Sequence, residues 1–454
     1  MNEFVRFPRW LVFVESFLLG IGPWVALPVD AATLHVWLDS PKPTLPFATW
    51  DTAATNIQQA IDAAEEGDTV LVTNGVYRAG SREVMPPNQE WDTRVPCRVV
   101  ITNAIVLRSV NGAGATIIDG EADVAVLCAY VGARSLLSGF TLTHGYAGVW
   151  CERLGAVKDC TISGNGLGGG AYGGTLSNCT LASNRRTGAT AALLYNCTLI
   201  GNYQWGPYEM WGGGVARCTL YNCFLSGNRA YCGGAAFDST LYSCALIGNG
   251  ASYGGGTYEC TLYNCTLTGN AALWGGGAWG GKLYSCIVYF NRSETGIDAN
   301  YPPSEVETTF ENSCTTPLPP GPGNIAADPW FVSGSAGDFR LRPDSACIDA
   351  GSNRADIGSS DLLGAPRIRD GNSDGIDRVD MGAHEFDPTF PFITRFKFTS
   401  DGLRLEWLGT ATGARLQRSK TLAVPDWQDV PGSVGTNAMA LPMGDTTGFF
   451  RLVR

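Results

Sequence analysis

The chain has 454 residues, of which 44% are hydrophobic, so it can bury a large core and is long enough for more than one domain. Its formal net charge of −11 argues against a nucleic-acid partner, because phosphate binding needs clustered Lys and Arg. Charged residues make up only 16% of the chain and glycine accounts for 58 positions, which favours turn-rich β structure.

The N-terminal segment has the features of a secretory signal peptide. Arg6 and Arg9 precede the apolar stretch 10–27, and small residues follow at 29–31. The alternative is an uncleaved membrane anchor, although the apolar run is interrupted by Glu15 and is short of the ~20 clean apolar residues that a spanning helix needs. In both cases we expect a secreted or cell-surface protein that meets a membrane only through this segment.

Residues 34–39 are predicted as a first strand, and a short helix is expected to follow from about residue 55. Ile57, Ile61 and Ala64 lie on one helical face, and Thr55 is a suitable N-cap. Such a helix is expected to cover the otherwise open strand edges at the N-terminal end of the fold.

A short phrase recurs from residue 176 to residue 291: LSNCTLASN, LYNCTLIGN, LYNCFLSGN, LYSCALIGN, LYNCTLTGN and LYSCIVYFN. The last four of its cysteines, at 223, 244, 265 and 286, stand 21 residues apart. A constant spacing over several repeats indicates a solenoid, in which each unit buries its apolar face against its neighbours. The units hold Thr, Leu, Tyr and Val in short runs broken by Gly and Asn, so they are predicted to consist of strands and turns.

Within one coil, a period of two places Cys218 and Leu220 inside and Arg217 and Thr219 outside, and the break at Asn222 predicts a corner. Stacking the coils then forms columns of like residues: Leu220, Leu241, Leu262 and Leu283 inside; Thr219, Thr240 and Thr261 outside; Asn202, Asn228, Asn249, Asn270 and Asn291 at a turn. Asn suits this turn because it tolerates left-handed backbone and its amide can bond along the stack.

Coils of about 20 residues with inner aliphatic and Cys columns and an Asn turn resemble the right-handed parallel β-helix of the pectin-lyase-like superfamily. The Cys-Thr-Leu-x-Gly-Asn coils, followed by SACIDAGSN, LLGAPRIRDG and VDMGAHEF, resemble bacterial surface proteins of the choice-of-anchor Q type over residues ~32–386. These motifs are specific for architecture. They imply little chemistry, because the calcium cluster and paired basic residues of pectate lyases and the clustered aspartates of polygalacturonase-like hydrolases do not stand out.

The remaining chain completes the predicted domain organisation. Residues 292–330 are irregular and Pro-rich, and residues 331–386 are expected to complete the end of the β-helix. Short alternating segments separated by turns follow, which predict a small β-sandwich-like module. The predicted protein is therefore an all-β monomer with a signal peptide (1–31), a parallel β-helix with an N-terminal capping helix (32–386) and a C-terminal β module (387–454).

Fifteen cysteines in an exported protein suggest disulfides, but their arrangement favours small buried hydrophobic side chains. Six of them form one inward column, and neighbours in a parallel stack point the same way, which is poor geometry for a disulfide. Cys314 and Cys347, which flank the last coil, are the pair for which this argument against a disulfide is weakest.

One constellation predicts a carbohydrate cleft. Arg217, Asp238 and Glu259 share an outward position in three successive coils, and Arg217 can pair with Asp238. Aromatic rings stack on sugar faces, and two carboxylates can supply acid and base while an Arg neutralises a uronate. These three residues are the catalytic candidates of a polysaccharide lyase or glycoside hydrolase. The binding candidates lie in the preceding column and in an insertion beside it: Trp205, Tyr208, Glu209, Trp211, Tyr253 and Trp274.

Two non-catalytic alternatives to this carbohydrate-cleaving site remain open. The column can bind a glycan without cleaving it, or it can be a short salt-bridge ladder on a non-catalytic surface or adhesion rod. His144, which ends an early strand, is either a base or a satisfied polar side chain at a turn.

The segment from residue 370 to residue 380 has the oxygen spacing of a calcium loop, with Gly375 at the sharp turn but Met381 where an EF-hand has Glu. The alternative is an Asp/Asn/Gly turn with no ion. The predicted calcium ligands are Asp370, Asn372, Asp374, Asp377 and Asp380.

Overall fold

The computed structural model describes most of the chain from residue 31 onward. The described residues are 31–85, 94–121, 125–204, 211–294, 299–302, 307–334, 337–355, 357–388, 392–399, 402–408, 415–419, 426–434, 436, 438–442 and 449–453. Among them, no helix has both the length and the apolar character needed to cross a membrane.

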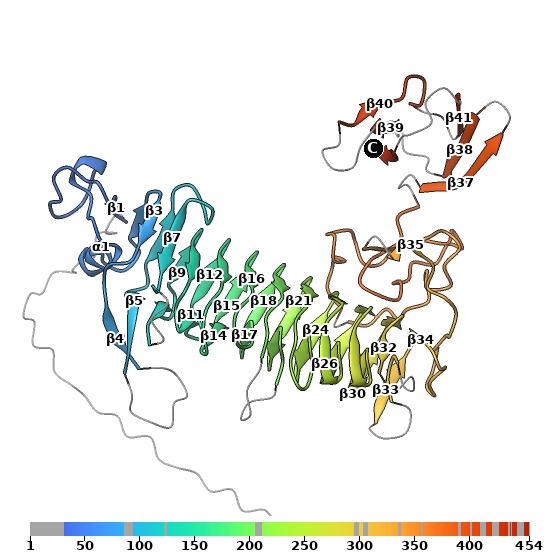
Figure 1. Ribbon diagram of the computed structural model, residues 1–454, viewed down its shortest axis with the longest axis horizontal. Helices are drawn as coiled ribbons and strands as arrows, with labels where there is room; N and C mark the ends of the chain where they lie inside the picture. Colours follow the sequence, from blue (N-terminus) through green and yellow to red (C-terminus); the bar gives the residue numbers. More distant parts are fainter. Residues whose placement is uncertain are drawn as a thin grey trace, which may run out of the picture.

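The described chain forms a stack of coils built from two long sheets, as Figure 1 shows. Neighbouring strands of the stack are parallel and in register, except where β4 pairs antiparallel with β5. The 20-stranded sheet comprises β1 (Thr33–Val36), β2 (Thr69–Val72), β4 (Arg82–Val84), β5 (Val95–Ile101), β6 (Val106–Ser109), β8 (Leu127–Val131), β9 (Leu136–Ser138), β11 (Ala147–Cys151), β12 (Ala156–Lys158), β14 (Gly169–Tyr172), β15 (Thr175–Ser177), β17 (Ala189–Thr190), β18 (Leu193–Tyr195), β20 (Val215–Ala216), β21 (Thr219–Tyr221), β23 (Ala236–Phe237), β24 (Thr240–Tyr242), β27 (Thr257–Tyr263), β30 (Ala278–Tyr284) and β33 (Thr308–Glu311).

The second long sheet has 11 strands and also runs along the whole stack. It comprises β3 (Gly75–Tyr77), β7 (Thr116–Asp119), β10 (Thr141–Thr143), β13 (Thr161–Ser163), β16 (Thr180–Ala182), β19 (Thr198–Ile200), β22 (Phe224–Ser226), β25 (Ala245–Ile247), β28 (Thr266–Thr268), β31 (Ile287–Tyr289) and β34 (Cys314–Thr315). A short third sheet holds β26 (Gly250–Tyr253), β29 (Ala271–Trp274) and β32 (Arg292–Ser293). This arrangement confirms the predicted all-β parallel solenoid.

At the N-terminal end, the 3-10 helix η1 (Trp50–Thr52) precedes the helix α1 (Ile57–Ala63). The predicted N-cap Thr55 is wrong: Asn56 has the extended backbone of a cap and accepts the Gln58 N–H at 2.8 Å. The amide of Gln58 bonds both backbone polar groups of Val100, at 2.8 and 3.1 Å, in the manner of a neighbouring strand. The helix is thereby fixed against β5.

The inner columns agree with the prediction. The four column leucines from Leu220 to Leu283 are all fully buried, and Asn222 turns the corner with φ of 53°. All fifteen cysteines are buried and free, and those of the repeat stack so that the Cys223 N–H points at the sulfur of Cys244, 3.4 Å away. The cysteines therefore pack as small apolar side chains.

The column of asparagines forms a continuous hydrogen-bonded ladder inside the stack. The amide of Asn228 donates to Asn249 Oδ1 (3.0 Å), which also accepts the Asn228 backbone N–H (2.9 Å). Asn249 in turn donates to Asn270 Oδ1 and to the Leu225 carbonyl, both at 2.9 Å. Because each amide is fully satisfied, this buried polar column stabilises the turn.

Replacing Asn249 with Ala is expected to lower the free energy of unfolding by about 2 kcal/mol, because the Leu225 carbonyl and the Asn228 N–H lose their buried partner. Urea unfolding measures the change. Asn111→Ala is the control, since Asn111 is exposed, and it should stay within about 0.5 kcal/mol of the parent. Equal effects for the two variants would contradict the role of the ladder.

Residues 345–386, here called the strap, belong to the segment expected to complete the end of the β-helix, and they lie along the corner column of the coils. Asn222 donates to Ser360 Oγ (3.3 Å), and Asn264 donates to the Asp380 carbonyl (3.0 Å). The Gly382 N–H donates to the carbonyl of Ser285 (2.8 Å). Three of the corner residues thus hold the strap against the coils.

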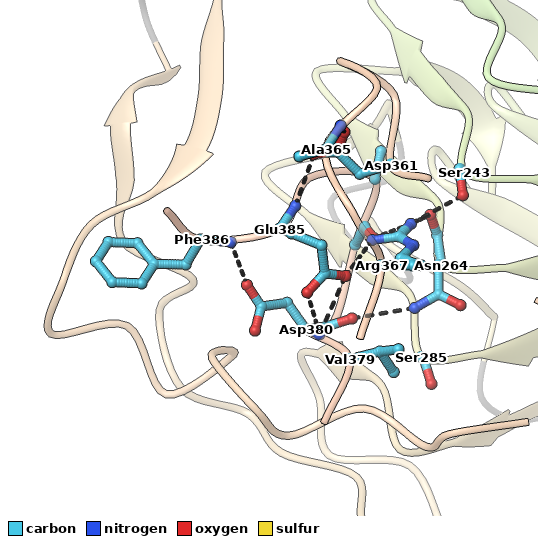
Figure 2. Close-up of polar contacts among 12 residues, drawn as sticks. Ser243, Asn264, Ser285, Asp361, Ala365, Arg367, Val379, Asp380, Glu385 and Phe386 are labelled. Atoms are coloured by element: carbon cyan, nitrogen blue, oxygen red, sulfur yellow. Dashed lines mark hydrogen bonds and ion pairs between the residues drawn. The ribbon is translucent and has the colours of Figure 1, made fainter. Parts of the chain in front are cut away.

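A buried charged cluster fastens the strap (Figure 2). The Arg367 guanidinium donates to Ser243 Oγ (3.0 Å) and to the carbonyls of Asn264 (3.2 Å) and Gly382 (3.0 Å). It also forms an ion pair of 2.5 Å with Glu385, and both side chains are only 1% exposed. Since no solvent reaches these groups, the cluster is structural.

The carboxyl groups of this cluster make stability depend on pH. Burial raises the pKa of Asp380 to about 6 and that of Glu385 to about 8, so the folded chain holds these protons more tightly than the unfolded chain. The stabilisation that follows from these raised pKa values is complete below about pH 4. It is lost as the pH rises through the folded-state pKa values of Asp380 and Glu385. The free energy of unfolding should therefore fall between pH 5 and pH 8, and Glu385→Gln should flatten the slope in urea titrations. If the free energy of unfolding of Glu385→Gln fell with pH as steeply as that of the parent, the role of Glu385 in this pH dependence would be contradicted.

Beyond the strap, two small antiparallel sheets agree with the predicted β module. One holds β37 (Phe392–Thr399), β38 (Gly402–Leu408) and β41 (Ala438–Pro442), and the other holds β39 (Arg415–Ser419), β40 (Gln428–Asp429) and β42 (Phe449–Val453). Their shared core includes the buried side chains of Leu405, Trp407 and Leu416.

Candidate functional site

The predicted aromatic column is present on the surface of the stack. Trp211 pairs with Cys232, Cys232 with Tyr253, and Tyr253 with Trp274 in parallel register. The insertion candidates Trp205, Tyr208 and Glu209 lie outside the described residues. The side chain of Trp211 packs against Phe237 in a tilted arrangement, with ring centroids 4.6 Å apart.

The charged column beside it does not bring its two carboxylates together. Arg217 Nε lies 3.8 Å from Asp238 Oδ2, which confirms the predicted pairing, and both side chains are more than 60% exposed. The Glu259 carboxylate instead lies over Gly280 of the following coil, where an added Cβ would come within 2.5 Å of Oε1. Asp238 is thus directed to the preceding coil and Glu259 to the next, so this surface shows no preassembled acid and base.

A second aromatic column flanks the charged one, on the strands β18, β21, β24, β27 and β30. Its rings stack with centroids 4.7–5.1 Å apart: Tyr195, Tyr221, Tyr242, Tyr263 and Tyr284. The strap covers one end of this column, because the Arg354 guanidinium lies 4.5 Å from the Tyr284 ring. Part of the tyrosine column therefore packs against the strap of the same chain.

A groove of about 770 Å³ lies elsewhere, between the second long sheet and the segment that leads to the strap. Turns after β25, β28 and β31 form its floor, and β35 (Phe331–Ser333) and β36 (Asp338–Leu341) form the opposite wall. Its lining residues are Ile247, Gly248, Thr268, Gly269, Phe290, Arg292, Asp328, Trp330, Phe331, Gly334, Phe339 and Arg342.

The floor of the groove departs from the repeat at one residue. The turn column reads Gly227, Gly248 and Gly269 with φ of 64–66°, and then Phe290 with φ of 58°. A left-handed backbone suits glycine and costs a bulky residue about 1–2 kcal/mol. Gly248 and Gly269 add no side chain to the floor, whereas Phe290, which is 51% exposed, places an aromatic ring at its end.

The opposite wall presents a second exposed aromatic residue in left-handed backbone. Trp330 has φ of 51° and is 46% exposed. Its N–H donates to Asp328 Oδ1 (2.8 Å), and its carbonyl accepts the Arg342 N–H (2.9 Å). The buried rings of Phe331 and Phe339 meet edge to face behind it, with centroids 5.4 Å apart. The two hydrogen bonds fix the backbone of Trp330.

Positive charge exceeds negative charge in this groove. The guanidinium groups of Arg292 and Arg342 line it, and that of Arg342 lies 5.4 Å from the centre of the Trp330 ring. Asp328 is the single carboxylate among the described lining residues. The groove can therefore hold an apolar ring face and an anionic or hydroxyl-rich group, but its described lining has no second carboxylate to complete a glycosidase pair.

Sequence reasoning missed this groove, although the signal was present. The repeat ends in Gly-Asn or Ser-Asn in five of the six quoted phrases and in Phe-Asn in the last. Phe290 stands inside a repeat phrase, and Trp330 ends the irregular Pro-rich segment 292–330, so neither position alone predicts a site.

The predicted calcium ligands form a hydrogen-bonded turn. Asp370 Oδ2 accepts the Gly375 N–H (2.9 Å), and Asn372 Oδ1 accepts that of Asp374 (2.8 Å). Asp380 is not placed with them, because its carboxylate accepts backbone N–H groups within the buried strap cluster. No group of three or more His, Cys, Asp or Glu in the described part of the chain is arranged to hold a metal ion. Calcium binding at residues such as Asp377 stays a prediction.

His144 has the structure of a satisfied polar side chain at a turn, which was the alternative to a catalytic base. It turns the chain with φ of 56°, and its Nδ1 lies 3.2 Å from Asp119 Oδ1. Burial works against ionisation of Asp119, but hydrogen bonds from the Glu121 N–H, Arg78 and His144 outweigh it and lower the pKa of this carboxyl. The imidazole is thus a bonded side chain at a turn.

No family model matches the chain, and no curated protein matches it either. Similar solved structures include the pectate lyase Pel9A (12% identity, TM-score 0.47, covering 79% of this chain and 98% of that one) and the Dettilon tailspike protein (11%, 0.37, 92% and 93%). Another is the A-module of the mannuronan C-5 epimerase AlgE4 of Azotobacter vinelandii (13%, 0.27, 65% and 98%). At these identities the comparisons assign no chemistry to this chain, and the choice-of-anchor Q resemblance stays a prediction.

Proposed function

We propose that this protein binds a polysaccharide in the groove between Phe290 and Trp330 and does not cleave it there. The observation that carries the proposal is Phe290 itself. An aromatic side chain occupies a left-handed position that preceding coils give to glycine, and it does so where the chain forms a groove. Backbone strain of this kind is a signal of function.

The lining suits a glycan chain. Sugar rings present apolar C–H faces that pack on aromatic rings, and the two exposed rings stand at opposite sides of a floor formed by glycine backbone. The guanidinium groups of Arg292 and Arg342 favour a glycan that carries carboxylate or sulfate groups. Such a ligand needs a local positive site, because the chain as a whole is strongly acidic.

Binding without cleavage follows from the carboxylates. Asp328 stands alone in the described lining, and its Oδ1 is engaged by the Trp330 N–H. Cleavage by Asp238 and Glu259 would need these two exposed side chains to reorient toward each other. The proposal further places the protein outside the cell, where the predicted signal peptide would deliver it.

Phe290→Gly tests the proposal, because it restores the residue of the preceding coils. We expect about tenfold weaker glycan binding with a free energy of unfolding that is unchanged or about 1 kcal/mol higher. A glycan array on residues 32–454 identifies the ligand, and calorimetric titration compares the variant with its parent.

Three outcomes would contradict the proposal. Absence of binding to any glycan would leave a surface rod, and full affinity in Phe290→Gly would remove the groove from the site. Reducing-end sugars or unsaturated uronates released from a bound glycan would show that the protein cleaves it.

A further inference from the structure

Two cysteines outside the repeating column meet at the end of the stack. Cys314 lies on β34, and Cys347 lies near the start of the strap. Both are fully buried and belong to one apolar cluster with Phe331, Phe339 and Met381. Both side chains thus pack in the same small cluster, although they come from segments more than 30 residues apart.

Cys314 points away from the interior of the coils. In the register of β31 and β34 it stands opposite Ile287, and both pack in the outer apolar cluster, whereas Cys286 and Val288 pack in the inner core. The inner place that cysteines fill in the preceding coils is taken by Ser313, whose Oγ accepts the Cys286 N–H (3.0 Å). Cys314 and Cys347 therefore approach each other from two different segments.

The repeat cysteines are neighbours as well, but they occupy equivalent positions of parallel strands. Cys223, Cys244 and Cys265 follow one another along parallel strands, and each backbone N–H points at the next sulfur at 3.4 Å. Their Cα–Cβ bonds point the same way, which disfavours the dihedral angle near 90° that a disulfide needs.

We propose that Cys314 and Cys347 form a disulfide when the chain folds in the presence of a disulfide oxidant. The two thiols give up two protons and two electrons as the S–S bond forms, and the oxidant, for example glutathione disulfide, is reduced to two thiols. Exchange takes place before the strap covers the pair, because it proceeds through an accessible mixed disulfide.

The bond would close the loop from residue 314 to residue 347. This loop carries Trp330, Phe331 and Arg342, which form one wall of the groove. A cross-link that restricts the loop preorganises this wall for its ligand. This consequence rests on the proposed function, whereas the bond itself does not.

Thiol counting tests the bond on the mature chain, residues 32–454, folded in a glutathione redox buffer. After alkylation in denaturant, the mass should show 13 modified thiols (15 − 2). Peptide mapping should find the cross-link between residues 314 and 347. All fifteen thiols modified, or cross-links within the repeat column, would overturn the proposal.

Two variants sharpen the test. Cys347→Ser should leave all remaining thiols free. Cys260→Ser should keep the cross-link, and it is the matched control because the preceding coil already has Ser239 at this column position, accepting the Cys218 N–H at 3.1 Å. Loss of the cross-link in Cys260→Ser as well would overturn the assignment.

Glycan affinity is then measured on oxidised and reduced samples, with severalfold weaker binding expected after reduction. Equal affinities alongside a mapped cross-link would overturn the preorganisation of the wall. Absence of glycan binding would refute the proposed function and leave the thiol count intact.

Discussion

Replacing Arg367 with Met is expected to detach the strap from the coils, with a loss of about 3–5 kcal/mol in the free energy of unfolding. Above about pH 8, where Glu385 is ionised, the substitution leaves this buried carboxylate without its ion pair, and at any pH it removes the donor to the Asn264 and Gly382 carbonyls. Hydrogen exchange of the Gly382 amide, which donates to the Ser285 carbonyl, reports the detachment directly.

Two controls separate this cluster from general effects of charge. Arg369→Met removes a neighbouring arginine whose ion pair with Asp387 is partly exposed, so it should cost less than about 1 kcal/mol. The double variant Arg367→Met with Glu385→Met should recover part of the loss, because it leaves no unpaired buried charge. Unchanged exchange of the strap amides in Arg367→Met would refute the role of the cluster.

Replacing Trp330 with Ala is expected to weaken glycan binding by about 30- to 100-fold, the loss typical of a central aromatic contact. The indole is half-exposed and lies beside the Arg342 guanidinium, and the Trp330 backbone is bonded to Asp328 and Arg342. Titration with the glycan that the array identifies measures the change in affinity.

Trp211→Ala is the matched control for this prediction. It removes an indole of similar exposure from the surface column that the sequence pointed to, and no residue of this column lines the groove. The groove account expects full affinity in Trp211→Ala. Loss of binding in this variant with full affinity in Trp330→Ala would assign the glycan to the surface column.

The coils were predictable because each inner position repeats the same physical requirement. Leu220 and its equivalents fill one apolar column. Each ladder asparagine, such as Asn249, donates to a leucine carbonyl at the equivalent position of the stack. Every repeat therefore reinforces the same inference. The strap was not predictable in this way, because Arg367 meets partners more than 100 residues away and has no repeated equivalent.

The sequence placed candidate residues in correct register but could not give the direction of exposed side chains. Asp238 and Glu259 occupy equivalent positions, yet one carboxylate pairs with Arg217 and the other lies over a glycine of the next coil. The groove depends on Trp330, which comes from an irregular segment with no periodicity. Only its three-dimensional neighbours, Phe290 among them, reveal its setting.

Hydrogen exchange with and without a bound oligosaccharide tests the location of the site most directly. The groove account predicts new protection at the backbone amides of Gly248, Gly269 and Arg292 and across residues 328–334 and 338–342. It predicts no change at residues 211–217, 237–238 and 258–259 of the surface columns. Protection confined to those columns, with none in the groove, would contradict the account.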